Sequence, residues 1–293
     1  MISVFYRPEQ SCASNESISP SAGKPRQVVA DWLARQDIAD HIRIESFDPV
    51  DTGTLKLAHE GDYVDRVLAC ELDNGFGNKN PEVARSLAFT TGSLLAAARH
   101  AIANQTLAVS PTSGFHHAHW DSGYGFCTFN GLMVTALKLR QLGLAKRVLI
   151  LDFDGHYGDG TDQIIKATKS QDWIVNVTRT KSYETARECL RSISVGSLYE
   201  TCQEQLKGRP DVVLYQAGAD IWKGDPLGAG LLTAAEMRQR DESVFRIAKN
   251  ASVPIVFNLA GGYARDVNGT IEPVLKLHRQ TIEEAINVYG RTR

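Results

Sequence analysis

Apolar runs of strand length alternate with amphipathic stretches of helix length along most of the chain. The predicted strands cover residues 3–6, 41–47, 106–110, 147–154, 172–178, 211–218 and 254–262. The predicted helices cover residues 24–36, 60–70, 80–105, 127–143, 159–170, 233–250 and about 270–290. Strands that are apolar on both faces are typical of a parallel sheet covered by helices on each side. The pattern therefore predicts a three-layer α/β/α fold with a central, mostly parallel sheet.

The chain has no low-complexity linker, internal repeat or shift in composition. Its 293 residues would suit two domains of average size, but one α/β domain also reaches this length. The polar motifs described below must converge from both halves of the chain to form one site. We therefore expect a single catalytic domain over residues 1–293.

Charge and composition narrow the class of partner. Lys and Arg number 32 against 34 Asp and Glu, a net charge of −2, and no basic run is present, which argues against nucleic acid and anionic membranes. No apolar stretch reaches transmembrane length, and the N-terminus lacks a secretory pattern. Five cysteines without a C-x-x-C pair fit reduced thiols. We expect a cytoplasmic protein. The sequence is compatible with a homo-oligomer but does not determine the oligomeric state.

Polar residues gather where four of the predicted strands end. Open parallel sheets bind ligands in the crevice at the carboxyl ends of their strands, so these residues are expected to meet. Each motif alone is also typical of a loop, a tight turn or a helix cap. The occurrence of four such motifs at one edge of a sheet favours a functional site over four unrelated turns. The motifs are His116-His117, Asp152-x-Asp154-x-His156, Asp220, and Gly261-Gly262-Tyr263.

The spacing of Asp154 and His156 predicts half of a metal site. Residues two apart on an extended chain share one side, so the carboxylate and the imidazole can bind the same ion. Asp220, after a later strand, would add a second carboxylate. Three nitrogen and oxygen ligands with one position open for water are typical of catalytic zinc.

The histidines are concentrated near this motif. Of eight in the chain, four lie between residues 116 and 156: His116, His117, His119 and His156. Adjacent histidines beside a metal can act as general base and electrostatic partner when acidic groups orient them, and Asp152 and Asp159 are available. The remaining candidates His59, His100 and His278 lie in helix-like segments, where packed or solvated roles are expected. No nucleophile elbow, P-loop or dinucleotide fingerprint is present.

Taken together, these motifs resemble the histone deacetylase superfamily, which includes bacterial histone-deacetylase-like amidohydrolases and acetylpolyamine amidohydrolases of the arginase–deacetylase fold. The resemblance covers most of the chain. The motifs that carry it, in the family's order, are HEGDYVDRV (59–67), GFHHAHWDSGYGFCTFNG (114–131), DFDGHYGDGT (152–161), GADIWKGDPLG (218–228) and LAGGYARD (259–266).

The resemblance implies metal sites at defined positions. One zinc ion would be bound by Asp154, His156 and Asp220, in agreement with the spacing argument. A structural potassium ion would be bound by Asp152, by the backbone carbonyls of Asp154 and His156, and by Thr178.

The resemblance also implies roles in catalysis and substrate binding. His116 and His117 would be oriented by Asp152 and Asp159 respectively, with His117 as the general base that deprotonates the attacking water and then protonates the leaving amine. Tyr263 would donate a hydrogen bond to the substrate carbonyl. Gly125 would accept the scissile amide N–H with its backbone carbonyl, and the Phe126 ring would wall the pocket.

Three departures from the family pattern affect the expected pocket. Tyr157 stands where the family often has a second histidine, which changes a contact around the metal. The stretch after the strand at 172–178 lacks the Pro-Gly-rich loop that usually shapes one wall. Asp73 and Asn74 are alternative candidates for a rim position that grips the substrate backbone. Substrate preference is therefore the least constrained part of the prediction.

The predicted function is zinc-dependent hydrolysis of the amide in acetylated or short-acylated amines, small molecules or peptides, such as acetyl-lysine or acetylpolyamines. One alternative is an arginase-type ureohydrolase with two manganese ions. It would need further bridging ligands, and only Asp225-Pro226 follows Asp220 closely. A second alternative is a non-catalytic module that binds acylated ligands, against which the retention of every candidate catalytic group argues.

Overall fold

Seven parallel strands form one sheet in the order β2-β1-β3-β7-β6-β4-β5. The structure, a computed structural model, describes residues 1–290, so the last three residues of the expected 1–293 domain lie outside it. The strands are β1 (Ile2–Phe5), β2 (Ile42–Glu45), β3 (Leu107–Ser113), β4 (Val148–Asp152), β5 (Ile174–Thr178), β6 (Val212–Gln216) and β7 (Ile255–Ala260). The predicted parallel sheet is confirmed.

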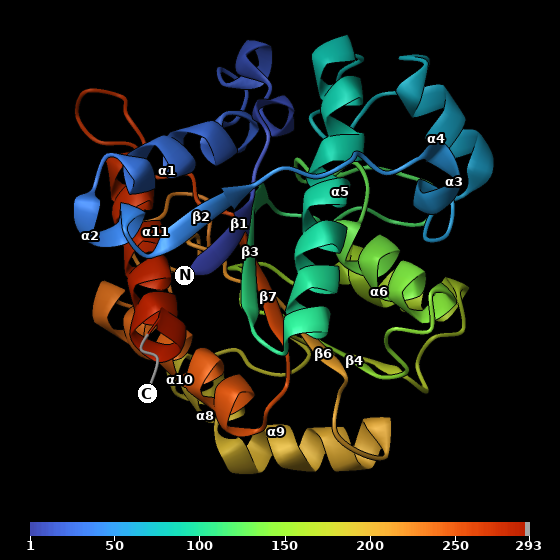
Figure 1. Ribbon diagram of the computed structural model, residues 1–293. Helices are drawn as coiled ribbons and strands as arrows, with labels where there is room; N and C mark the ends of the chain where they lie inside the picture. Colours follow the sequence, from blue (N-terminus) through green and yellow to red (C-terminus); the bar gives the residue numbers. More distant parts are fainter. Residues whose placement is uncertain (291–293) are drawn as a thin grey trace.

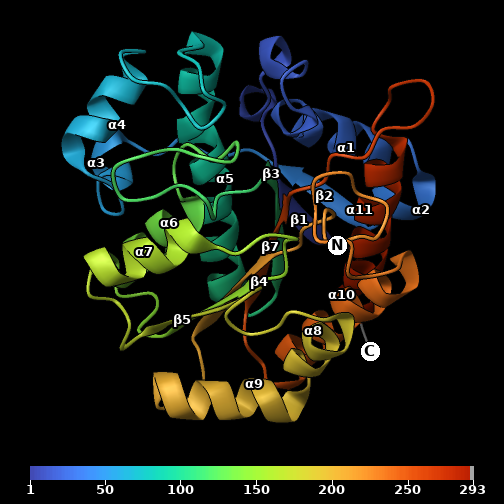
Figure 2. The same ribbon diagram turned by 180° about the vertical axis from the view of Figure 1, so that it is seen from behind.

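Helices cover both faces of this sheet (Figures 1 and 2). On one face lie α4 (Gly61–Leu68), α5 (Pro81–Asn104), α6 (Gly131–Gln141) and α7 (Asp159–Ala167). On the other lie α1 (Lys24–Leu33), α2 (Gln36–Ala39), α8 (Ala186–Ser192), α9 (Val195–Thr201), α10 (Ala234–Asn250) and α11 (Glu272–Ala285). The short helix α3 (Thr52–Leu55) lies beside α4 and α6. The α/β class with three layers is as predicted.

Alternate side chains of β4 explain why this segment forms a central strand. Leu149 and Leu151 pack into the core under α10 and α11, whereas Val148 and Ile150 pack into the core under α5 and α6. All four are buried. A strand with both faces covered gains from apolar residues at every position, so the run lacks the polar alternation of a half-exposed strand.

Two segments differ from the sequence prediction. The helix expected over 127–143 begins at Gly131, because the Asn130 side chain accepts a hydrogen bond from the Met133 backbone N–H at 3.1 Å and caps the helix there. Residues 127–129 instead continue the loop that follows β3. The stretch after β5, for which no element was predicted, forms α8 and α9; α8 starts with a reciprocal cap between Thr185 and Glu188.

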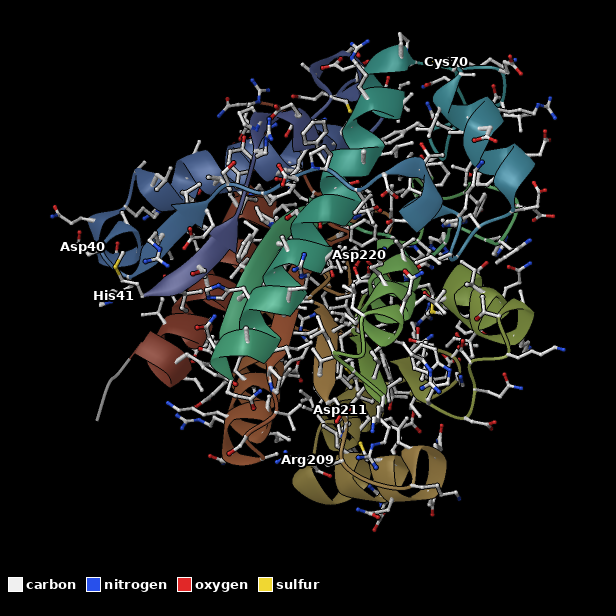
Figure 3. All side chains as sticks on the ribbon, turned by 45° about the vertical axis from the view of Figure 1, so that its right-hand side comes forward. Asp40, His41, Cys70, Arg209, Asp211 and Asp220 are labelled. Atoms are coloured by element: carbon white, nitrogen blue, oxygen red, sulfur yellow. The ribbon has the colours of Figure 1, made fainter. Side chains whose placement is uncertain are left out.

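The four polar segments follow four strands that are adjacent in the sheet, namely β3, β7, β6 and β4. Figure 3 shows the direction in which β6 runs: Arg209 and Asp211 lie near its amino end, and Asp220 lies beyond its carboxyl end. The topology therefore brings the ends of all four strands to one edge. Among residues 1–290, no helix is both long and apolar enough to cross a membrane.

Candidate active site

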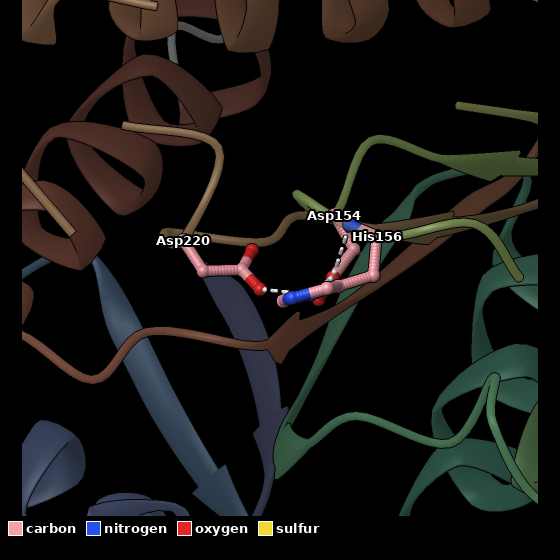
Figure 4. A group of neighbouring side chains, drawn as sticks. All are labelled: Asp154, His156 and Asp220. Atoms are coloured by element: carbon pink, nitrogen blue, oxygen red, sulfur yellow. Dashed lines mark hydrogen bonds and ion pairs between the residues drawn. The ribbon is translucent and has the colours of Figure 1, made fainter. Parts of the chain in front are cut away.

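Asp154, His156 and Asp220 form a compact cluster at the carboxyl ends of β4 and β6. Each offers a ligand atom, and these atoms lie within 4.8 Å of one another. His156 Nδ1 lies 3.2 Å from Asp154 Oδ1 and 3.0 Å from Asp220 Oδ2, and Figure 4 shows the three side chains directed toward one another. Both carboxylates are buried, whereas His156 is partly exposed. The structure thus assembles the three residues predicted as zinc ligands.

Backbone N–H groups hold the outer oxygens of both carboxylates. Gly155 donates to Asp220 Oδ1 and Gly261 donates to Asp154 Oδ2, each at 2.8 Å. A Cβ atom on Gly261 would lie only 2.2 Å from Asp220 Oδ2 and 2.8 Å from Asp154 Oδ2. Glycine is required here because the chain passes directly against the carboxylate oxygens of Asp154 and Asp220. The remaining oxygens are left facing His156.

The electrostatics of the cluster fit a bound cation. Burial raises the pKa of Asp220 to about 7, and the adjacent Asp154 carboxylate adds to the rise. Two buried carboxylates at one position repel each other, and a divalent ion between them would remove that cost. One imidazole nitrogen and two carboxylate oxygens match the ligands of a catalytic zinc site. The donor set therefore fits zinc.

His116, in the loop after β3, pairs with the last residue of β4. His116 Nδ1 lies 2.8 Å from Asp152 Oδ2, and both side chains are buried. Burial opposes protonation of this imidazole, but the carboxylates of Asp152 and Asp154 outweigh it and raise the pKa of His116 to about 9. In the absence of a metal, the pair is an imidazolium bound to a carboxylate.

His117 pairs with a different acid in a different environment. His117 Nδ1 lies 2.6 Å from Asp159 Oδ1, and His119 Nε2 lies 3.2 Å from the other oxygen of the same carboxylate. Burial, together with the neighbouring His116, lowers the pKa of His117. Burial raises the pKa of Asp159, but the hydrogen bond with His117 and the nearby His117 and His119 imidazoles together outweigh it and lower the pKa to about 2. The adjacent histidines therefore differ in charge, with His117 the neutral one.

Asp152 is the centre of a buried hydrogen-bond network. Its Oδ1 accepts from Gln216 Nε2 at 2.9 Å, and its Oδ2 accepts from Thr178 Oγ1 at 3.3 Å. The Tyr183 hydroxyl donates to the Asp152 backbone carbonyl at 3.2 Å. Thr178 and Asp152 thus lie together as the expected potassium site requires, although the binding of that ion remains a prediction.

A pocket of about 410 Å³ lies over the cluster and brings most of the predicted residues together. Its lining residues are His117, Tyr124, Gly125, Phe126, His156, Tyr157, Asp159, Arg179, Thr180, Leu227 and Tyr263. Gly125 has φ +55°, and a Cβ atom there would lie 2.6 Å from His117 Cδ2. The loop can therefore pass this close to the imidazole only with glycine at that position.

Tyr263 reaches the pocket because the chain turns sharply after β7. Its ring lies 5.7 Å from the Phe126 ring, and its hydroxyl has a pKa well above the usual value, chiefly through burial and then through the carboxylates of Asp220 and Asp154. Asp225 Oδ2 accepts the backbone N–H groups of Tyr263 at 2.6 Å and Ala264 at 3.1 Å. The phenol is therefore neutral and held by its backbone.

Three residues that support the site were missed by the sequence interpretation. Asp225 fixes the Tyr263 segment, and its place in the GDPLG run was the available signal. Lys24, on α1, is completely buried and donates to the backbone carbonyl of Ala260; burial lowers its pKa to about 8 against the effect of the ligand carboxylates. Arg179 lines the pocket. Nothing local in the sequence marks Lys24 or Arg179, because each acts across distant segments.

Three further histidines, His59, His100 and His278, have the packed or surface positions expected for them. His59 is buried, its Nδ1 donates to the His119 carbonyl at 2.8 Å, and its Nε2 accepts from the Asn130 backbone N–H at 2.8 Å. His278 is buried on α11, and His100 is half-buried on α5. All three lie outside the metal cluster.

The rim candidates do not line the pocket. Asp73 is exposed, and the Asn74 side chain is turned inward, where Nδ2 donates to Asn78 Oδ1 at 2.8 Å. Tyr157, in contrast, lines the pocket and donates to Asp162 Oδ2 at 2.8 Å. The expected grip on the substrate by Asp73 or Asn74 has no support in this geometry.

Comparison with known proteins gives a family match along most of the chain. A family model described as "Histone deacetylase domain" matches residues 21–176 and 175–275. An uncharacterized protein of Picosynechococcus sp. is 30% identical over 246 residues, which cover 78% of this chain and 81% of that protein.

Named deacetylases match over shorter parts of their length. Histone deacetylase 2 of Arabidopsis thaliana is 28% identical over 177 residues, covering 54% of this chain and 44% of that protein. Histone deacetylase 8 of Xenopus tropicalis is 28% identical over 199 residues, covering 59% of this chain and 53% of that protein. The matched segments thus span about half the length of these two relatives.

A solved structure matches almost the whole chain. The crystal structure of acetylpolyamine aminohydrolase from Burkholderia pseudomallei superposes with a TM-score of 0.72, covering 98% of this chain and 99% of that one. At 15% sequence identity, this likeness concerns the fold alone. It confirms the predicted arginase–deacetylase fold.

Proposed function

Since the chain belongs to the histone deacetylase family, we propose that it is a zinc-dependent amidohydrolase that removes acetyl or another short acyl group from an amine. The carrying observation is that the Asp154, His156 and Asp220 cluster, two His–Asp pairs and Tyr263 converge at one edge of the sheet. Because these groups come from both halves of the chain, we further propose that residues 1–293 act as one catalytic domain.

Asp154, His156 and Asp220 are the residues that would hold the metal. When bound, a zinc ion supplies Lewis acidity, which polarises the amide carbonyl and lowers the pKa of water. The backbone N–H groups of Gly155 and Gly261 orient the two carboxylates for this role. Such outer contacts fix ligand direction before the ion binds.

His117 is suited to proton transfer. Its Nδ1–H donates to Asp159, so Nε2 carries the lone pair that accepts a proton from the attacking water. Its lowered pKa keeps the imidazole neutral, and therefore basic, at neutral pH. After the amide carbon is attacked, the same nitrogen returns the proton to the leaving amine. His116 remains hydrogen-bonded to Asp152, which fixes its imidazole beside the reacting groups.

Tyr263 is suited to stabilise the developing negative charge on the carbonyl oxygen. Its hydroxyl is protonated at all relevant pH values, because its pKa is raised well above the usual value. A donor that is already in place strengthens as the oxyanion forms and needs no reorganisation. Gly125 and Phe126 line the same pocket, where the Gly125 carbonyl would accept the amide N–H and the Phe126 ring would contact the alkyl chain of the substrate.

An arginase-type reaction has less support. Among residues 1–290, a single group of three metal-ligating side chains is found, and the Asp225 carboxylate is already occupied by three backbone N–H groups, those of Leu227, Tyr263 and Ala264. A dimanganese ureohydrolase would need further bridging ligands at this point. Metal analysis distinguishes the two proposals, since one zinc per chain is expected and two manganese ions would contradict it.

The test is hydrolysis by purified, zinc-loaded protein. A panel of Nε-acyl-lysine peptides and acetylated polyamines is incubated with wild type and Asp154→Ala, and the released amine is quantified. We expect turnover of at least one substrate that is lost with a chelator, restored by zinc and absent in Asp154→Ala. Binding without turnover would instead favour a non-catalytic module, and the absence of chelator-sensitive hydrolysis would sink the proposed function.

A further inference from the structure

Arg179 places a positive charge in the wall of the proposed catalytic pocket. It follows the last residue of β5, and its side chain lines the pocket with His156 and Tyr263. Its Nη1 donates to the backbone carbonyl of Gly155 at 3.1 Å. Because Gly155 lies between two of the proposed zinc ligands, the guanidinium is held next to the reacting centre.

The other charged groups of the pocket are already engaged. Asp159 is the one acidic residue among the lining residues, and both of its oxygens are occupied, by His117 and by His119. Asp73 is not part of the lining. A cationic substrate would therefore find Arg179 in this pocket but no uncommitted carboxylate.

The charge of Arg179 is only weakly compensated within the protein. The nearest acid is Glu184, whose Oε2 lies 3.7 Å from Arg179 Nη2 and whose side chain is 55% exposed. A pair of this length at the surface contributes little. Arg179 Nε is buried, and Nη1 is engaged with Gly155, but 28% of the side-chain surface is exposed. Among the described residues Nη2 has only the long contact with Glu184, so it is the donor left for a ligand.

We propose that Arg179 selects acylated amines that carry a carboxylate and disfavours polycationic acetylpolyamines. This selectivity rests on the proposed function of the pocket as an amidohydrolase site. A guanidinium binds a carboxylate through short, charge-assisted hydrogen bonds and repels an ammonium group. Specificity then arises from attraction and repulsion together. The carboxylate can belong to the amine, as in an acylated amino acid, or to the acyl group, as in a succinyl amide.

The segment between β5 and α8 contributes Arg179 to the pocket wall. The segment lacks a Pro-Gly-rich loop, and the chain instead enters α8 at Thr185. Arg179 and Thr180 are therefore the residues of this segment that line the pocket. Arg179 is a specificity-determining residue in this proposal, and the chemistry stays with the His, Asp and Tyr groups.

The test compares matched substrate pairs. Nε-acetyl-lysine is compared with its α-carboxamide, and an Nε-succinyl-lysine amide is compared with its neutral succinamoyl isostere, so each pair isolates one carboxylate. N-acetylputrescine serves as the cationic substrate. The ratio of kcat/KM within each pair is measured for wild type, Arg179→Gln, Arg179→Lys and Arg179→Glu. Arg187→Gln, which removes an exposed Arg of α8, is the control for net charge.

We expect wild type to prefer the carboxylate in at least one pair by about 10- to 100-fold, the range of one charge-assisted hydrogen bond. The preference should vanish in Arg179→Gln, persist in part in Arg179→Lys and persist fully in Arg187→Gln. Arg179→Glu should shift selectivity toward N-acetylputrescine. Equal rates within both pairs for wild type, or a preference that survives in Arg179→Gln, would overturn the proposal.

Calorimetry distinguishes a failure of the proposed function from a failure of the proposed selectivity. If wild type hydrolyses none of these compounds, binding of Nε-acetyl-lysine and its carboxamide is measured for wild type and Arg179→Gln. Tighter binding of the carboxylate that depends on Arg179 supports the selectivity even without turnover. Equal affinities for the two ligands would reject the selectivity independently of catalysis.

Discussion

The floor and the outer wall of the pocket are built in opposite ways. The floor is defined here as Asp154, His156, Asp220 and Gly261, of which His156 lines the pocket; its two carboxylates are buried and accept hydrogen bonds from backbone N–H groups at two strand ends. The outer wall is defined as Tyr124, Arg179 and Leu227; Tyr124 is 65% exposed and Leu227 53%, whereas Arg179 is half-buried. The floor thus sets one geometry, whereas the wall leaves side chains free to meet different ligands.

This difference separates the reaction from the choice of substrate. Groups whose positions are set by the backbone can be preorganised for one charge distribution, as catalysis requires. Side chains on exposed loops can change without disturbing the sheet. Substitutions in the floor should therefore abolish turnover for every substrate, and substitutions in the wall should change which substrate is preferred.

The largest effect is expected for Asp220→Asn. Removal of this carboxylate should lower activity below detection on all substrates, because a ligand charge is lost. It should not destabilise the metal-free protein, because the repulsion between two buried carboxylates is relieved. Thermal unfolding with and without zinc checks both points: zinc should raise the Tm of wild type and leave that of the variant unchanged. A variant that still binds zinc with wild-type affinity would contradict the ligand assignment.

Tyr263→Phe should have the next largest effect. Loss of one preorganised donor typically lowers kcat by about 10²- to 10³-fold, and KM should change little because the hydrogen bond strengthens only as charge develops. Steady-state kinetics on the best substrate provide the measurement, and unchanged zinc content is the control for folding. Turnover at the wild-type rate would remove Tyr263 from the mechanism.

Gly261→Ala tests whether the floor depends on close approach of the backbone. The new Cβ atom would lie 2.2 Å from Asp220 Oδ2, so the carboxylate must move, and displacement on the ångström scale costs about 100-fold in rate. Zinc affinity should fall in parallel. Gly196→Ala in α9 is the matched control, because nothing lies within 4 Å of its Cβ position. Equal losses in both variants would show a general effect on stability and not a local one.

The smallest expected effect concerns stability and involves the loop from residue 114 to 130. His59 holds this loop as a neutral imidazole, which bonds both His119 and Asn130. Burial lowers the pKa of His59 from 6.5 to about 4, so the unfolded chain binds more protons than the folded one between these pH values. Stability should therefore be complete above pH 6.5 and fall as pH decreases toward 4, by about 3 kcal/mol in total.

Urea unfolding of wild type and His59→Gln across pH 4–7.5 measures this contribution. Both proteins share all other titrating groups, so the difference between their pH slopes reports His59. The variant should be less stable at pH 7.5 and should lose less stability on acidification. Identical slopes would show that His59 does not couple protonation to the fold.

The sequence interpretation was most successful where local pattern and long-range packing agree. β4 was predicted because its apolar run is buried on both faces, and α5 because a Pro-started, amphipathic segment is long enough to be unambiguous. The start of α6 was placed too early: the Phe129 ring packs against His59 and Tyr63, and the Thr128 hydroxyl accepts the Gly75 backbone N–H, so this segment does not extend the helix. α8 and α9 were missed because their sequence pattern is weak and their burial depends on the neighbouring core.

The candidate site was predictable in its parts and not in its surroundings. Asp154, His156 and Asp220 carry their chemistry in residue type and spacing, so a sequence reading could select them. Lys24 and Arg179 carry no such signal. Lys24 meets the site from α1, and Arg179 meets it from the end of β5, by contacts between segments far apart in the chain.

The sequence by itself determined the class of fold and the kind of chemistry, because hydrophobic periodicity and ligand-bearing residue types are local properties. Only the tertiary structure decided which polar groups are free and which are occupied. It assigned Asp225 to backbone N–H groups and Asp159 to two imidazoles, and it left Arg179 Nη2 with only a long contact to Glu184. The physical reason is that the availability of a charge depends on neighbours brought together by the sheet order and not by the chain.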